Sequence, residues 1–346
     1  MSRRIIGSRA ELVAALRKQR ATPERAERVR ALLQDMFLDA LFLVAQFPGG
    51  QIAEADKCCY AYDVRLCAGL CRATWAEEAF WSGLVRVHAG PRKVTRLIFA
   101  AAHGDAARVA WLLARGAPRE AKNIDGITAL LWASWEGHTG ALRVLLAAGA
   151  NVDAAVNLGA TPLYATAEMG RTDAMRALLA AGANVDAAMN VGTTPLFVAA
   201  EKGHTDAVCT LLAAGANVDA AMNDGATPLF IAVQNGHIDA VRALLAAGAN
   251  VDAATDEGAT PLNIAAELGH TDAMRALLVA GANVEAACID GWRPLHTASR
   301  RDHAAAATLL LDAGADVNAL TNAGASPLDV AETPALRKLL MSRGGV

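Results

Sequence analysis

The sequence lacks any apolar run that could cross a lipid bilayer. Its longest such stretch, residues 36–47, contains Asp39 and is shorter than the roughly 20 residues that a membrane-spanning helix needs. A secretory signal is also missing, because the arginines that follow Met1 lead into polar and charged sequence instead of an apolar core. We therefore predict a protein of the cytoplasm, or of the nucleus, that does not associate with membranes.

Cysteine and net charge are also low. Six cysteines in 346 residues are too few and too unevenly placed for a disulfide framework, which indicates a reducing compartment. The formal net charge of -3 provides no overall attraction to nucleic acid. Hydrophobic residues make up 54% of the chain and charged residues 19%, which excludes a disordered polymer. We expect a folded monomer that binds no nucleic acid.

What the sequence does contain is one unit repeated along its C-terminal three quarters. Three series of glycines, which begin at Gly104, Gly116 and Gly126, each recur every 33 residues. One insertion would put all three series out of step, and none occurs. Asp302 stands where one glycine is expected, and aspartate is among the few residues that tolerate a left-handed backbone.

Each unit predicts two short helices joined by turns. In the unit at residues 190–220, Thr194 is placed to cap the first helix, and the proline after it suits the first helical position. Gly203 stops that helix by accepting a left-handed backbone. The pair Thr205-Asp206 predicts a cap and an acidic first turn for the second helix.

This unit resembles the ankyrin repeat. The Thr-Pro-Leu core of that family recurs, fully or nearly, in the segments that begin at Thr128, Thr161, Thr194, Thr227, Thr260, Arg293 and Ser326. The family's histidine after this core survives only at His296, so we expect its usual side-chain bond to be missing from most repeats. The resemblance implies an all-α ankyrin-repeat solenoid of about eight repeats over residues 94–346, behind an N-terminal helical module at residues 1–93.

Both ends of the array are atypical. The first repeat places Thr95 in the capping position with no glycine turn before it. In the last repeat a glycine is due at position 347, but Gly344 arrives early. We predict that the connection between the last two helices is shortened.

The N-terminal module carries two further patterns. Residues Leu70–Leu84 resemble the second half of an F-box, which docks a substrate receptor onto a ubiquitin ligase core; the Cys-Arg pair at Cys71 and the tryptophan Trp75 support this. The alternative is a helical cap that shields the first repeat from water. The four cysteines between residues 58 and 71, with His88, suggest zinc, but the usual short knuckles are missing and buried free thiols are the alternative.

Motifs for catalysis are missing from the sequence. There is no Gly-rich phosphate loop, no nucleophile in a strand-turn-helix context, and no His and acid pair at metal spacing. Histidines and aspartates recur once per repeat, which indicates that they serve the fold; they are His138, His204, His237, His270, Asp153, Asp186, Asp219 and Asp252. We predict a protein that is not an enzyme and uses no cofactor or metal.

The resemblance implies that a partner protein binds to the turn tips and to the exposed side of each repeat's first helix, the concave face. The candidates at the turn tips are Asp125, Leu158, Val191, Asp224, Asp256, Glu257 and Asp290. The candidates at the helix ends are Trp135, Glu136, Glu168, Met169, Glu201, Lys202, Gln234, Asn235, Glu267, Leu268, Arg300 and Arg301.

Acids dominate these positions until Arg300 and Arg301, so we predict an acidic groove that ends in a basic patch and favours a mostly basic partner segment. Trp135 and Trp292 are the predicted anchors, because tryptophan is enriched among interface hot spots. Alternatively, the charges only keep an alanine-rich array in solution. The function indicated is that of a scaffold or adaptor; the alternative is a substrate receptor that recruits a cullin-type ubiquitin ligase through an adaptor bound near Leu70–Leu84.

Overall fold

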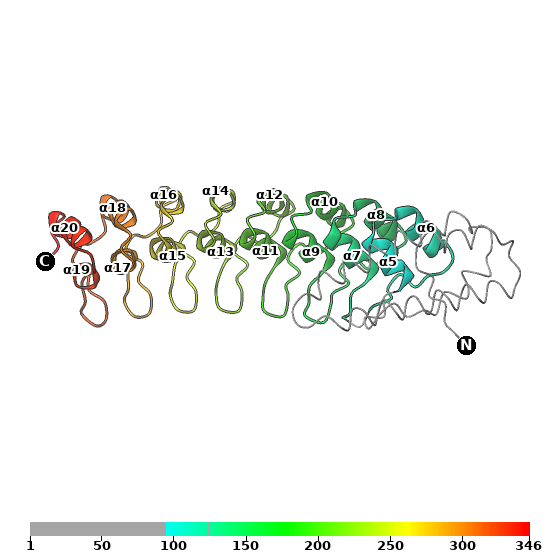
Figure 1. Ribbon diagram of the computed structural model, residues 1–346, viewed down its shortest axis with the longest axis horizontal. Coiled ribbons are helices and arrows are strands. Elements are labelled where there is room, and N and C mark those ends of the chain that lie inside the picture. Colours follow the sequence, from blue (N-terminus) through cyan, green and yellow to red (C-terminus); the bar gives the residue numbers. More distant parts are fainter. Residues whose placement is uncertain (1–94, 124) are drawn as a thin grey trace, which may run out of the picture. The chain divides into compact units, whose positions relative to one another are not determined.

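The computed structural model describes residues 95–123 and 125–346, and this part of the chain is a row of helix pairs (Figure 1). The first helix of each pair, called the inner helix, is α5 (Arg96–Ala102), α7 (Ala129–Glu136), α9 (Pro162–Glu168), α11 (Pro195–Glu201), α13 (Pro228–Gln234), α15 (Pro261–Leu268), α17 (Pro294–Arg300) or α19 (Pro327–Val330). The second, called the outer helix, is α6 (Ala106–Ala114), α8 (Thr139–Ala147), α10 (Thr172–Ala180), α12 (Thr205–Ala213), α14 (Ile238–Ala246), α16 (Thr271–Val279), α18 (Ala304–Asp312) or α20 (Pro334–Ser342). The predicted all-α repeat solenoid is confirmed for the described residues.

Inner and outer helices form two layers. Helix α11, for example, contacts α9 and α13 in its own layer and α12 in the other. Extended turns, called fingers, connect each pair to the next, and Figure 1 shows them leaving the array on one side, beneath the inner helices. The predicted N-terminal module, its F-box-like segment and its cysteines lie outside the described residues.

The core runs continuously along the array because each repeat has too little apolar surface to close on itself. Leu196 on α11 and Leu211 on α12 are completely buried, as are the equivalent leucines of the neighbouring repeats. Burial of one such side chain is worth about 1.5–3 kcal/mol. Most of the cover comes from adjacent repeats, so stability is shared along the stack.

The predicted caps are confirmed for most inner helices, whereas the cap predicted at Thr205 for an outer helix is wrong. The Thr194 hydroxyl accepts a hydrogen bond from the Phe197 N–H (3.2 Å), and the following proline occupies the first turn of α11. Thr205, however, is the first residue of α12, and the residue in the capping position is His204. His204 makes no cap because its Nε2 donates instead to the Glu168 carbonyl oxygen of the preceding repeat (3.1 Å).

The backbone turns follow the predicted left-handed conformation. Gly203 has φ 71°, and Asp302, in its glycine position, has φ 59°. The last repeat is shortened in a different place from the one predicted: α19 itself has only 4 residues, and Ala331 is already extended after it. Thr333 then caps α20 directly.

The position after the Thr-Pro-Leu core is used in two ways. His296 is fully buried; its Nδ1 accepts from the Arg293 N–H (3.3 Å) and its Nε2 donates to the carbonyl oxygens of Ala319 (3.0 Å) and Ala325 (3.1 Å). Burial lowers the pKa of this imidazole, and the hydrogen bond accepted by Nδ1 is one that only the neutral ring can make. Phe197 and Phe230 make an apolar contact at this position instead.

Two other residues at this position restore a polar bond and are exceptions to the loss expected in most repeats. Asn263 Oδ1 accepts from the Thr260 N–H (3.3 Å), and Asp329 Oδ2 accepts from the Ser326 N–H (2.8 Å). Short polar side chains reach back to the capping residue just as histidine does, so the bond survives the change of residue type.

Candidate functional site

The fingers are hydrogen-bonded to one another from one repeat to the next. The Asn190 N–H donates to the Leu158 carbonyl oxygen (3.2 Å), and the Asn223 N–H donates to the Val191 carbonyl oxygen (3.2 Å). The same backbone bond recurs from Asp256 to Asp224 (2.9 Å), from Ile289 to Glu257 (3.1 Å) and from Asn322 to Asp290 (3.1 Å). The tips from Leu158 to Asp290 therefore form one preorganised row, which we call the finger row.

A second ladder of bonds lies at the bases of the fingers. One carboxylate oxygen of Asp186 accepts from the Asn217 N–H of the next repeat (3.0 Å), and Asp219 accepts in the same way from the Asn250 N–H (2.9 Å). The recurring aspartates thus join repeats together. Their assignment to the fold rather than to chemistry agrees with this geometry.

The candidate residues at the ends of the inner helices are also held by the next repeat. The Glu201 carbonyl oxygen accepts from His237 Nε2 and from Asn235 Nδ2, both at 3.0 Å. Gln234 and Glu267 offer their carbonyl oxygens to His270 (3.3 Å) and His303 (3.0 Å) in the same way. The backbone that carries these side chains is therefore fixed, while the side chains remain at the surface.

Charges at these ends are only partly neutralised. Lys202 pairs with the adjacent Glu201 (3.2 Å), and Arg301 pairs with Glu267 of the preceding repeat (2.5 Å). Glu136 and Glu168 form no salt bridge with any basic residue in the part of the chain that the structure describes. The surface therefore keeps unpaired acids, and one of the two arginines predicted as a basic patch is already engaged.

Tyr164 belongs to this acidic surface and was missed by sequence reasoning. It is half-buried on α9, and burial together with the carboxylates of Glu168 and Glu201 raises its pKa to about 12. Glu168 lies on α9 and Glu201 on α11, so carboxylates of two successive repeats contribute to this shift. The only sequence feature that singled out Tyr164 was its place in the family's histidine position.

The two predicted tryptophan anchors differ in accessibility. Trp135, near the end of α7, is 38% exposed. Trp292 is half-buried, with the Arg300 guanidinium 4.9 Å from its ring centroid and the His296 ring edge-on at 5.9 Å. Trp111 on outer helix α6 was not predicted, although it is 43% exposed with Arg115 stacked on it at 3.9 Å.

The remaining candidates lie at the surface without bringing reactive groups together. Asp125, Asp224, Asp256 and Glu257 are exposed at finger tips, Gln234 and Asn235 are exposed at the end of α13, and Met169 is half-buried after α9. No group of three His, Cys, Asp or Glu residues among those described is arranged to hold a metal ion. None of the described helices is both long and apolar enough to span a membrane.

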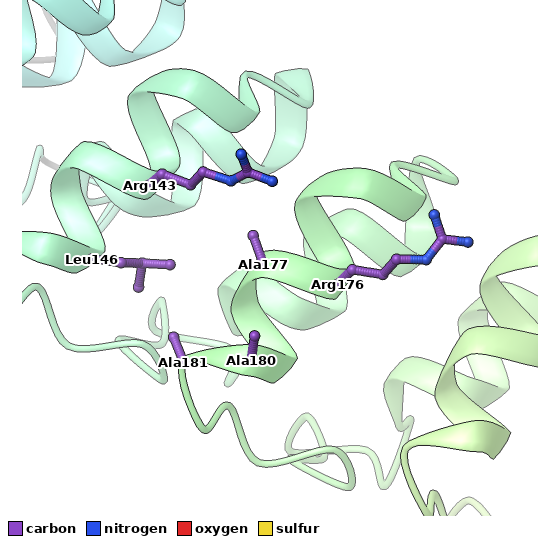
Figure 2. Close-up of a pocket in the computed structure, with 6 residues that line it drawn as sticks. All are labelled: Arg143, Leu146, Arg176, Ala177, Ala180 and Ala181. Atoms are coloured by element: carbon purple, nitrogen blue, oxygen red, sulfur yellow. The ribbon is translucent and has the colours of Figure 1, made fainter.

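A shallow hollow of about 380 Å³ lies between outer helices α8 and α10 (Figure 2). Its floor is formed by Leu146, Ala177 and neighbouring alanines, and Arg143 and Arg176 flank it. The two arginine side chains extend in the same direction instead of converging on the hollow, as Figure 2 shows, and Arg176 pairs with Asp173 (3.2 Å). The hollow is separate from the candidate residues and resembles an ordinary groove between helices.

Comparison with known proteins agrees with this architecture. A family model described as ankyrin repeats (3 copies) matches residues 97–189, 152–222, 187–255 and 249–321. Among solved structures, the crystal structure of the human ASB11 ankyrin repeat domain is similar, with 27% sequence identity over 73% of this chain and 99% of that chain and a TM-score of 0.50. No curated protein matches the chain. The chain belongs to the ankyrin repeat family.

Proposed function

We propose that the array is a scaffold that holds a basic segment of a partner protein against its acidic inner side. Ankyrin repeats are protein-interaction modules, so the general role follows from the family. Beyond this general role, the proposed partner is basic and lies along the inner-helix ends and the fingers.

Unpaired carboxylates carry this proposal. The fingers at residues 148–160, 181–193, 214–226, 247–259 and 280–292 contain no lysine or arginine. Glu136 and Glu168 likewise lack a described basic partner. Acids that have no basic partner in the described part of the chain create a negative potential that steers a basic segment toward this side and rejects an acidic one.

The test is a measured affinity for partners recovered by the full chain from cells. Glu136→Gln combined with Glu168→Gln should weaken binding by several fold and reduce its dependence on salt, because exposed charges act over about 8–10 Å at ordinary ionic strength. The control neutralises two acids on outer helices, Asp206→Asn with Asp239→Asn, and removes the same net charge from the other layer.

Equal losses in the two double variants would mean that only net charge matters, and the proposal would fail. Unchanged affinity in the inner-side variant would have the same consequence. Circular dichroism of each variant shows whether the helices are intact.

A second candidate function is that of a substrate receptor for a cullin-type ubiquitin ligase. The F-box-like residues Leu70–Leu84 favour it. It requires that a Skp-type adaptor co-purifies with the full chain and is lost from residues 94–346, whereas a plain scaffold recovers the same proteins with both. Absence of the adaptor from the full-chain sample would remove this candidate.

A further inference from the structure

We propose that the finger row binds one partner segment that is apolar in one part and basic in the other, in a fixed order. This inference rests on the proposed function, since it names the composition of the basic partner. The finger tips, rather than the inner-helix ends, set the orientation of that partner.

The exposed tips change character along the finger row. The first two tips are apolar: Leu158 is 65% exposed and Val191 is 50% exposed. The tips that follow are acidic and exposed, namely Asp224, then Asp256 and Glu257, then Asp290. Ile289, 68% exposed, adds an apolar side chain beside the last acid.

The order is a property of the rigid row and not of one mobile loop. Backbone hydrogen bonds of 2.9–3.2 Å join every tip from Leu158 to Asp290 to the next finger. Asp125 stands outside this run, because no backbone hydrogen bond from the next finger to its carbonyl oxygen is described. Apolar and acidic tips are therefore held at fixed separations before any partner arrives, which lowers the ordering cost of binding.

The acidic part has no counterion among the residues that the structure describes. No described basic side chain forms a salt bridge with Asp224, Asp256, Glu257 or Asp290. These carboxylates are exposed, with one oxygen of Asp224 accepting from the Ala226 N–H (3.0 Å), and lysine or arginine on a partner matches their charge. The exposed apolar side chains of Leu158 and Val191, earlier in the same row, contribute favourable free energy only when a partner covers them.

The separations set the length of the partner segment. Packed helices lie roughly 8–10 Å apart, so successive fingers are spaced by about that distance. An extended chain advances about 3.3 Å per residue, which gives about three residues per finger and about a dozen from Leu158 to Asp290. The partner segment should carry an apolar pair at one end of such a stretch and a basic cluster at the other.

In the experiment, the full chain selects peptides from a random display library. The displayed peptides must be long enough to span the finger row. Enriched peptides should contain an apolar pair and, within about a dozen residues, a basic cluster. Leu158→Ser with Val191→Ser should weaken their binding about tenfold and leave its salt dependence unchanged. Asp256→Asn with Glu257→Gln should weaken it by several fold and remove most of the salt dependence.

The proposal is overturned if no peptide is enriched, if the enriched peptides lack either part, or if both pairs of tip variants bind them as the wild type does. The inner-side variant, Glu136→Gln with Glu168→Gln, separates this failure from that of the proposed function. Loss of binding in that variant alone would keep the basic partner but move it away from the finger row. No loss in any variant would defeat both.

Discussion

At the scale of single residues, a glycine after an inner helix meets two requirements, a left-handed backbone and space for a side chain of the next repeat. A glycine after an outer helix meets only the first. Gly203 and Gly215 both have a left-handed backbone, with φ 71° and 87°. A Cβ added to Gly203 would lie 2.5 Å from His237 Nδ1, whereas one added to Gly215 would meet nothing within 4 Å. The histidine ring of the next repeat therefore occupies the space that a side chain at Gly203 would need.

We expect Gly203→Ala to cost about 2–3 kcal/mol of unfolding free energy and Gly215→Ala about 1 kcal/mol, because only the first adds a clash to the backbone strain. Urea unfolding followed by circular dichroism measures both. Adding His237→Ala to Gly203→Ala should recover part of the loss. Equal costs for the two glycine variants would show that the ring does not restrict this position.

At the scale of helices, the two threonines of one repeat are not equivalent. Thr194 is buried and accepts from the Phe197 N–H, whereas Thr205 is already inside α12. Removing the first hydroxyl leaves an N–H of α11 without its partner, and removing the second does not. Thr194→Ala should cost about 1 kcal/mol, within the usual 0.5–2 kcal/mol for a helix cap.

Thr205→Ala is the matched control and should change stability by less than about 0.5 kcal/mol. Thermal and urea unfolding of the two variants can be compared in one experiment. A larger loss for Thr205→Ala would restore the original prediction that this threonine caps the outer helix.

At the scale of the whole array, repetition makes one unit dispensable. Met189-Asn190 and Met222-Asn223 occupy the same position in successive repeats, so deleting residues 190–222 rejoins equivalent atoms. The shortened chain should keep the helical content per residue and unfold at a lower urea concentration, because one set of interfaces between repeats is lost. Circular dichroism measures both quantities.

A deletion that breaks the period is the control. Removing residues 190–211 deletes α11 and leaves only Leu212 and Ala213 of α12, so the fingers on either side are joined out of register. This variant should lose most of its helical signal near the junction. If it proved as stable as the in-register deletion, the 33-residue unit would not be the unit of folding.

Predictions from sequence succeeded where the reason was local. The Thr194 cap and the left-handed Asp302 depend on residues within one or two turns, and both were found. The Thr205 cap was wrong because the competing bond of His204 is to Glu168, in another repeat. No pattern within the unit shows which of two neighbouring residues will turn toward the repeat before it.

The sequence by itself determined the architecture, since a strict period, caps and turn glycines repeat without a slip and each unit needs neighbours to bury its leucines. Only the tertiary structure decided which surface charges remain unpaired. Arg301 meets Glu267 from 34 positions away, and the carboxylates of two successive repeats raise the pKa of Tyr164. Stacking of the repeats brings these side chains together. Whether a charge is paired therefore depends on contacts between repeats that a linear pattern does not contain.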